Sequence, residues 1–309
     1  MIVNTGSRTD IPAYFSEWFY NRIQEGAVMA RNPYHPAQIQ RFLLDPRVVD
    51  CLVFCTKNPG PMLERLGELE GFSQFWGVTV TPYGREIEPH VPDKRQVLEF
   101  VWDLSRRVGS RAVAWRYDPI FITERYSVEY HIQAFEKMAA RLSGYTSQCV
   151  ISFIDLYTKT KRNFPGVRQV KREERILLGK EFVQIGKTYG MTIRSCCEGE
   201  ELKPYGVDCG GCMSREVLEQ AIGAPLLVPK GKKPAREGCG CLLGSDIGAY
   251  NTCGHGCIYC YANDNPKLAA ENRRLHNVHS PLLIGELGRD DVVKEAEQVT
   301  WIDRQLRLF

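Results

Sequence analysis

The chain has 309 residues, of which 43% are hydrophobic and 25% are charged, and its formal net charge at pH 7 is +3. These values are typical of a globular protein with one large domain, or one domain and a smaller appendage, and so small a net charge gives no indication of nucleic-acid binding. The N-terminal residues do not combine a basic start with an apolar run, and no stretch approaches the length of a membrane span. We therefore expect a cytoplasmic protein that makes no contact with a membrane.

The first two-thirds of the chain alternates short apolar segments with longer amphipathic ones. Apolar segments that we expect to form strands cover residues 1–5, 51–55, 75–80, 112–117, 149–154 and 191–196. Amphipathic segments that we expect to form helices cover residues 15–26, 93–109, 127–144 and 172–190. Strands that alternate with helices predict a parallel sheet with the helices outside it.

Polar or reactive side chains recur at the C-terminal end of nearly every predicted strand. They are Ser7, Arg8, Asp10, Thr56, Lys57, Asn58, Thr79, Thr81, Arg116, Asp118, Asp155, Tyr157 and Cys196. A (β/α) barrel gathers its strand ends around one mouth, whereas an open doubly wound sheet spreads them along a crevice. We therefore predict an α/β fold in which residues 1–195 form a partial (β/α) TIM-like barrel of about six parallel strands.

The cysteines are concentrated late in the chain, where nine of the twelve follow Ser195. Clustered thiols without a sign of export more often hold metal than form disulfides. The spacing C-x3-C-x2-C within "CGHGCIYCYA" is formed by Cys253, Cys257 and Cys260. Three thiolates can bind three irons of a cubic [4Fe-4S] cluster and leave the fourth iron open to a ligand. Tyr259 could cover the cluster or a bound nucleobase.

This loop resembles the hallmark C-x3-C-x-aromatic-C motif of the radical S-adenosylmethionine superfamily, with Tyr259 as the aromatic residue. The resemblance implies a partial (β/α) barrel and an open iron that binds S-adenosylmethionine. It also implies an enzyme that forms a 5′-deoxyadenosyl radical, abstracts hydrogen from a substrate and receives electrons from an external reductant such as flavodoxin or ferredoxin. The loop normally follows the first strand in that superfamily, whereas here it follows the last predicted strand.

The whole chain also resembles a bacterial family of unassigned function whose radical-SAM-like cysteines lie at the C-terminus. The segments that carry this resemblance are "TGSRTDIPAY", "RYDPI", "SFIDLY", "CGC", "DIGAYNTCGHGCIYCYA" and "QLRLF". Because this family indicates no substrate, a small molecule, a peptide and a nucleic acid all remain open.

A second group of cysteines surrounds the point where the predicted barrel ends: Cys196, Cys197, Cys209, Cys212, Cys239 and Cys241. The ligands that we favour for a second, auxiliary [4Fe-4S] cluster are Cys196, Cys212, Cys239 and Cys241, with Cys197 and Cys209 in reserve. A structural zinc is the alternative at this site. Zinc is also the alternative for the loop, where His255 could be a fourth ligand, although we expect it to point elsewhere. We therefore interpret residues 196–262 as a cysteine-rich cluster-binding region and residues 263–309 as a tail that packs on the barrel.

Several residues at the predicted mouth are candidates for binding and catalysis. Arg116 could bind the carboxylate of S-adenosylmethionine through two parallel hydrogen bonds, or it could form a structural ion pair with Asp118. Tyr157 could donate or relay hydrogen. The catalytic candidates are therefore Arg116, Asp118 and Tyr157. The cofactor-binding candidates are Tyr259, Arg116, Lys57 and Asn58. The basic segment 157–175 could attract a phosphate-bearing or nucleic-acid substrate, but a solvated loop and helix start is the favoured interpretation.

Two functions follow from these patterns. The first is a radical S-adenosylmethionine enzyme with two clusters and an unknown substrate. The second is an iron–sulfur or zinc protein that transfers electrons or binds nucleic acid without cleaving S-adenosylmethionine. The polar strand ends favour the enzyme, because a passive cluster carrier needs no such mouth.

Overall fold

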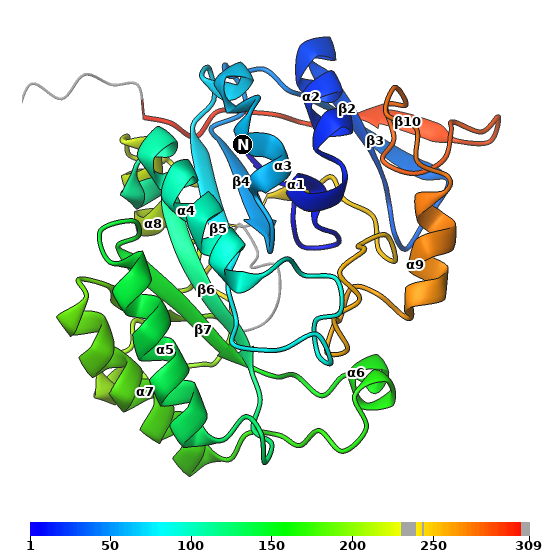
Figure 1. The fold of residues 1–309 in the computed structure, drawn as a ribbon. Helices are drawn as coiled ribbons and strands as arrows, with labels where there is room; N and C mark the ends of the chain where they lie inside the picture. The colour runs from blue at the N-terminus through cyan, green and yellow to red at the C-terminus, as the bar shows by residue number, and fades with distance from the viewer. Residues whose placement is uncertain (230–238, 243, 304–309) are drawn as a thin grey trace, which may run out of the picture.

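The computed structural model describes residues 1–229, 239–242 and 244–303, and its centre is a seven-stranded parallel sheet (Figure 1). In spatial order the strands are β8 (Thr192–Ser195), β7 (Gln148–Phe153), β6 (Val113–Ile120), β5 (Gln74–Thr79), β4 (Cys51–Thr56), β1 (Ile2–Asn4) and β9 (Ser245–Asp246). Six of them match the six predicted strands, and β9 is an addition from the cysteine-rich region. This confirms the α/β class and the parallel sheet. The edge strands β8 and β9 do not pair with each other in the described part of the chain, so the sheet is open there.

The four predicted helices are present as α2 (Ser16–Glu25), α4 (Lys94–Val108), α5 (Val128–Leu142) and α7 (Arg172–Thr188). The described residues also form the shorter helices α1 (Ile11–Tyr14), α3 (Gly60–Leu63), α6 (Thr158–Asn163), α8 (Arg215–Ile222) and α9 (Pro266–Arg273). Asp93 and Ser127 begin α4 and α5 because their side chains accept hydrogen bonds from the free amides of the first turn. No helix among the described residues is long and apolar enough to cross a membrane.

The strand order places the crossover helices on one face of the sheet. In the chain order β1, β4, β5, β6, β7 and β8, each strand of this sheet lies beside the one before it, always on the same side. Because parallel crossovers are right-handed, repeated steps in one direction bring all their helices to the same face. Helices α4, α5 and α7 lie side by side on that face, in front of the strands in Figure 1. The opposite face must therefore be covered by something else.

Side chains of β6 show how the two faces differ. Val113, Trp115 and Tyr117 point toward the helices and are buried in the larger core, where Trp115 stacks on Phe135 of α5 with ring centroids 4.7 Å apart. Strand side chains alternate between faces, so Arg116 points to the opposite side of the sheet. The helix-covered face is thus apolar along the whole strand, and the opposite face is not.

The opposite face is apolar near the amino ends of the strands and polar near their carboxyl ends. Its apolar part packs against α8 and against cysteines from residues 196–241: the core there contains Ile2, Cys51, Val53, Phe75, Ala114, Val150, Val217, Leu218 and Leu226. Its polar part lies two residues further along several strands, and no helix of the described residues covers it. This polar part forms the floor of the site described below.

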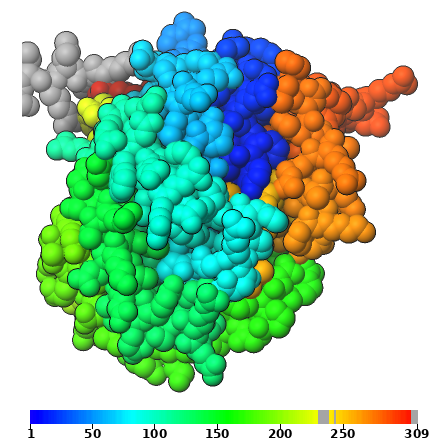
Figure 2. Space-filling view, viewed as in Figure 1, coloured from blue at the N-terminus to red at the C-terminus, as the bar shows by residue number. Residues whose placement is uncertain are grey.

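A smaller sheet joins the tail to the N-terminal third. Strand β10 (Val292–Glu295) pairs parallel to β3 (Gln38–Leu43), which pairs antiparallel with β2 (Ala27–Arg31). The indole Nε1 of Trp18 donates to the carbonyl of Ser280, and Figure 2 shows the orange residues of the tail against the blue N-terminal residues. No strands were predicted for residues 27–43. Residues 304–309, including the whole segment "QLRLF", lie outside the described residues.

The aromatic side chains stacked between α5 and α7 predict that substitutions at two positions of α7 will differ strongly in their effect on stability. Phe182 is fully buried and stacks on Phe135 with centroids 3.9 Å apart, whereas Leu177 is 44% exposed. We expect Phe182→Ala to lower the free energy of unfolding by about 3–5 kcal/mol, because it removes buried contacts and leaves a cavity. Leu177→Ala, the control on the same helix, should change it by less than about 1 kcal/mol. Equal losses of unfolding free energy in the two variants, measured by denaturant titration, would contradict this packing.

Candidate metal centre

A cavity of about 1490 Å³ opens at the carboxyl ends of the parallel strands. Its wall includes residues after β1, β4, β7 and β8 and residues in the carboxyl half of β6, which supports the predicted convergence of strand ends. Both cysteine groups reach it: the lining includes Cys196, Cys212, Cys239, Cys241, Cys253, Cys257 and Cys260. The two groups therefore face one shared space.

The loop that carries Cys253, Cys257 and Cys260 begins seven residues after β9 and lies over the end of β1. Gly254 is required where the loop passes Tyr14, because a Cβ atom at that position would meet the tyrosine ring at 2.5 Å. Burial raises the pKa of the Cys257 thiol to about 12, and Lys57 acts in the opposite direction. A metal would have to displace these protons, since cysteine binds metals as the thiolate.

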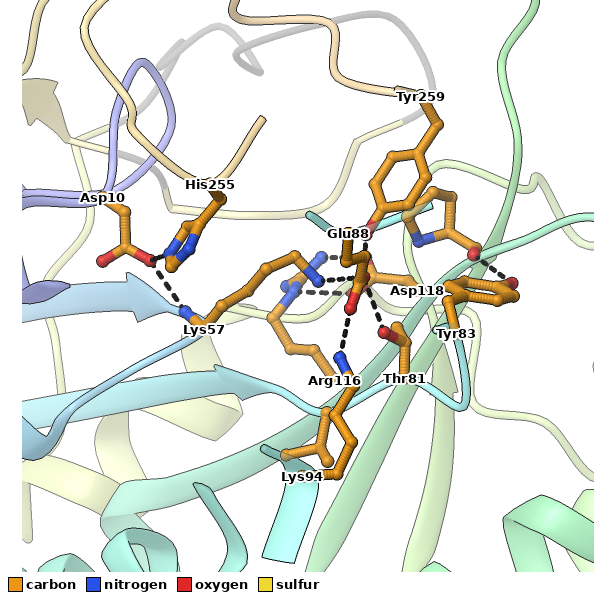
Figure 3. Close-up of polar contacts among 12 residues, drawn as sticks. Asp10, Lys57, Thr81, Tyr83, Glu88, Lys94, Arg116, Asp118, His255 and Tyr259 are labelled. Atoms are coloured by element: carbon orange, nitrogen blue, oxygen red, sulfur yellow. Dashed lines mark hydrogen bonds and ion pairs between the residues drawn. The ribbon is translucent and has the colours of Figure 1, made fainter. Parts of the chain in front are cut away.

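His255 is held by protein groups rather than aimed at the cysteines. Its Nε2 lies 2.8 Å from the Asp10 carboxylate, and its Nδ1 lies 3.1 Å from the hydroxyl of Tyr14. Asp10 also accepts a hydrogen bond of 2.8 Å from the backbone amide of Lys57 (Figure 3). Because both ring nitrogens have partners, His255 fixes the loop on the sheet and leaves no nitrogen for a metal in this arrangement.

Glu88 is the centre of a buried ionic network beside the loop (Figure 3). Its carboxylate is 1% exposed and pairs with Lys57 at 2.8 Å and with Lys94. The hydroxyl of Thr81 donates to it at 2.7 Å, and so does the hydroxyl of Tyr259. Burial alone would raise the pKa of Glu88, but the two lysines outweigh it and lower the pKa to about 2. The network therefore ties the cysteine loop, through Tyr259, to the segment that follows β5.

Arg116 and Asp118 form a two-point ion pair on the floor of the cavity. The Nη2 and Nε atoms of Arg116 donate to Asp118 at 2.5 and 3.2 Å, and the Ser152 hydroxyl lies 3.4 Å from the same carboxylate. Burial would lower the pKa of Arg116, but Asp118 and the nearby thiols of Cys212 and Cys196 outweigh it and raise the pKa. Arg116 is thus a permanent cation beside the second cysteine group.

The second cysteine group is compact. The Cys212 sulfur lies 3.5 Å from that of Cys196 and 3.3 Å from that of Cys241, and all three sulfurs lie within 4.8 Å of one another. Cys239 hydrogen-bonds to Cys241, and Cys197 contacts the thiols of Cys196 and Cys239. The structure therefore brings together the favoured cysteines and one of the two reserves.

Cys209, the other reserve, does not join this group. Its sulfur instead lies 3.6 Å from the carbonyl oxygen of Val207.

The other predicted residues have different surroundings. Lys57 lines the cavity, with its ammonium group 5.6 Å from the ring centroid of Tyr259. Asn58 is not among the lining residues, and its side-chain oxygen accepts from the amide of Gly60 at the start of α3. Tyr157 lines the cavity, is 45% exposed and donates to Asp155 at 3.3 Å. Asn58 is therefore the one predicted cofactor-binding residue that the structure places away from the cavity.

The basic segment 157–175 pairs much of its charge with the protein itself. Lys159 lies 3.3 Å from the Asp264 carboxylate, and Arg168 pairs with Glu174. Arg172 and Arg175 both pair with Glu201. This pairing agrees with the favoured interpretation of the segment as a solvated loop and helix start.

Sequence reasoning missed Glu88 and Lys94, which are two of the five residues of the buried network. Glu88 lies in a turn-rich segment between β5 and α4 that also contains Glu86, and neither acidic residue belongs to a motif. The available signal was Thr81, which lies just after β5 and donates a hydrogen bond to Glu88.

The open parallel sheet, the shared cavity and the compact thiols define an α/β protein with a cysteine group suited to a metal. The chain belongs to the family described as a domain of unknown function, DUF1848, whose family model matches residues 2–262. Both cysteine groups fall within the matched residues. A comparison with curated proteins finds no match.

The buried charge of Glu88 predicts a stability effect that depends on pH. Glu88→Gln keeps the shape but leaves Lys57 and Lys94 without their carboxylate, so we expect a loss of roughly 3–5 kcal/mol at pH 7 in denaturant titrations. The pKa of Glu88 is about 2 when folded and about 4.3 in an unfolded chain, so the charge stabilises the protein above pH 5. The difference between wild type and variant should therefore shrink as the pH falls from about 5 toward 2.

Glu68→Gln is the control, because Glu68 pairs with Arg65 at the surface, where ion pairs contribute less than about 1 kcal/mol. A Glu88→Gln loss as small as that of the control, or one that does not change between pH 7 and pH 3, would contradict the network.

Proposed function

We propose that this protein is a radical S-adenosylmethionine enzyme in which Cys253, Cys257 and Cys260 hold a [4Fe-4S] cluster. The observation that carries the proposal is the position of the C-x3-C-x-Tyr-C loop, which faces a large cavity at the carboxyl ends of parallel strands. Three thiols without a histidine partner fit a cluster that keeps one iron open. When bound, such a cluster would supply the electron that cleaves S-adenosylmethionine to a 5′-deoxyadenosyl radical.

The donor set of the loop fits this cluster better than a closed zinc site. His255, the one nitrogen candidate inside the loop, is engaged by Asp10 and Tyr14. The described residues contain no group of three ligand atoms within 4.8 Å that includes a loop cysteine, whereas one zinc ion would need such a group. Sulfurs that bind separate irons of a cube stand further apart.

Positively charged side chains and a large cavity lie beside the loop cysteines. Lys57 is a buried cation next to Cys257, and Glu88 fixes its position. The Nη1 of Arg116 makes no hydrogen bond to the described residues, so it can donate to a carboxylate in the cavity while Asp118 holds the other two nitrogens. A volume near 1490 Å³ exceeds the roughly 300–1,000 Å³ of ordinary ligand pockets, which leaves room for a substrate beside the cofactor.

The sheet supports the partial-barrel part of the proposal. Consecutive parallel strands with helices on one face are the arrangement of a (β/α) barrel, and here the strands stop before closure. We propose that a substrate enters through the open side and that a flavodoxin or ferredoxin supplies the electron.

The alternative is a protein that carries iron–sulfur clusters or zinc without cleaving S-adenosylmethionine. A carrier needs exposed or electron-accessible metal, but it needs no cavity lined by an arginine, a lysine and polar strand ends. The cavity therefore favours the enzyme.

The test is anaerobic reconstitution with iron and sulfide, followed by dithionite and S-adenosylmethionine. We expect 5′-deoxyadenosine to form, as measured by chromatography and mass spectrometry. Intact clusters without 5′-deoxyadenosine would favour the carrier and refute the enzyme.

Replacing the three loop cysteines tests the position of the cluster. Cys253→Ala/Cys257→Ala/Cys260→Ala should remove about four irons per chain and abolish 5′-deoxyadenosine formation. The control is Cys209→Ala, because Cys209 belongs to neither cysteine group; it should keep both the iron and the activity. Unchanged iron content in the triple variant would show that the loop does not hold the cluster.

A further inference from the structure

The two cysteine groups differ in the spacing of their sulfur atoms. In the second group three sulfurs lie within 4.8 Å of one another, with pairs at 3.3 and 3.5 Å. The loop cysteines form no such group within the described residues. Because both groups belong to the same chain, their sulfur spacings can be compared directly.

Sulfur spacing distinguishes one metal ion from a cluster. Four thiolates around one tetrahedral ion, each at about 2.3 Å, place neighbouring sulfurs about 3.8 Å apart. In a cubic cluster each thiolate binds a different iron and points away from the cube, so neighbouring sulfurs stand roughly 6 Å apart. The spacing of Cys196, Cys212 and Cys241 is close to the first value and far from the second.

The backbone around this group is shaped to hold a thiolate. The amide of Met213 donates to the Cys241 sulfur at 3.3 Å, and the amide of Leu242 donates to the carbonyl of Met213 at 2.8 Å. A Cβ on Gly240 would meet the carbonyl oxygen of Gly210 at 2.3 Å, so the two turns can approach this closely only because position 240 is glycine. The segments 209–213 and 239–242 therefore form a tight pair of turns that present Cys212 and Cys241 to one point.

We propose that Cys196, Cys212, Cys239 and Cys241 bind a single zinc ion rather than the second [4Fe-4S] cluster. Cys239 completes the set because it is buried and contacts Cys241 two residues away. Cys197 lies beside Cys196 and Cys239 and is a neighbour of the site, not a ligand. Thiolate ligands with tetrahedral spacing suit zinc, and zinc carries out no redox chemistry.

Charge at the site is consistent with four thiolates. A dication bound by four thiolates has a net charge of −2, which is costly to bury without a cation nearby. Arg116 is buried among these sulfurs and its own position is fixed by Asp118. The arginine therefore offsets part of the negative charge from the cavity side.

The position of the site gives it a structural role. Cys196 follows β8, Cys212 precedes α8, and Cys239 and Cys241 lead toward β9. One ion would join these three segments, which together cover the face of the sheet that α4, α5 and α7 leave open. This proposal does not depend on S-adenosylmethionine cleavage, since the loop cysteines take no part in it.

The test is metal analysis of protein purified without oxygen from cells supplied with both zinc and iron. The loop variant Cys253→Ala/Cys257→Ala/Cys260→Ala should retain about one zinc per chain, with no iron and no cluster absorption. Four irons and no zinc in this variant would overturn the proposal in favour of an auxiliary cluster. One iron in place of zinc, or no metal, would overturn it as well.

Further variants test the ligands. Cys212→Ala/Cys241→Ala should lose the zinc and keep the iron of the loop, and Cys239→Ala should reduce zinc retention in the presence of a chelator. Cys197→Ala and Cys209→Ala should keep the zinc. Loss of zinc in Cys197→Ala with full retention in Cys239→Ala would refute Cys239 as the fourth ligand.

Cobalt substitution tests the geometry without altering any of these ligands. Co²⁺ added to the metal-free loop variant should give the strong visible absorption of a tetrahedral tetrathiolate site, and one equivalent of Zn²⁺ should abolish it. A spectrum of six-coordinate cobalt would overturn the tetrahedral site, and this holds even if the variants that lack Cys212, Cys239 or Cys241 fail to fold.

Discussion

The architecture depends on one constraint: consecutive right-handed crossovers cover only one face of a parallel sheet. Helices α4, α5 and α7 fill that face, and the other would be left to water. The chain after β8 covers it in two ways. Apolar side chains of α8 and the cysteines of residues 196–241 pack on its apolar part, and the loop that carries Cys253, Cys257 and Cys260 lies at the cavity beside the polar strand ends. The strand ends under this second layer are polar, so the layer does not pack closely on them. The cavity is the space that remains between the two.

Charge links the second layer to the sheet. Glu88 binds Lys57 from the end of β4 and Tyr259 from the loop, while Asp10 binds His255 from the same loop. Each contact joins residues that lie far apart in the chain, and each is buried, where electrostatic interactions are stronger than at the surface. The loop is therefore held on two sides before any metal is considered. Such prior positioning reduces the entropy cost of ordering three cysteines around one centre.

Much of the fold could be predicted from periodicity. Predicted helices 93–109 and 127–144 correspond to α4 and α5 within two residues at each end, because capping residues and apolar spacing act locally. The convergence of polar strand ends was also predictable, since parallel strands share one edge. The hairpin at 27–43 was not, because its strands are half-exposed and the connection between them contains Pro33 and Pro36. Nor was the choice of cysteines at the second group, since six candidates differ only in where distant turns bring them.

Strand β1 lies between β4 and β9, which fixes an order of assembly. Residues Ile2–Asn4 gain their second neighbour only when Ser245–Asp246 arrives, more than two hundred residues later. During synthesis on the ribosome this strand must wait at an unpaired edge, and contacts so distant in sequence form slowly. Any metal that the loop acquires would therefore reach a chain in which strands β1 to β8 have already been synthesised.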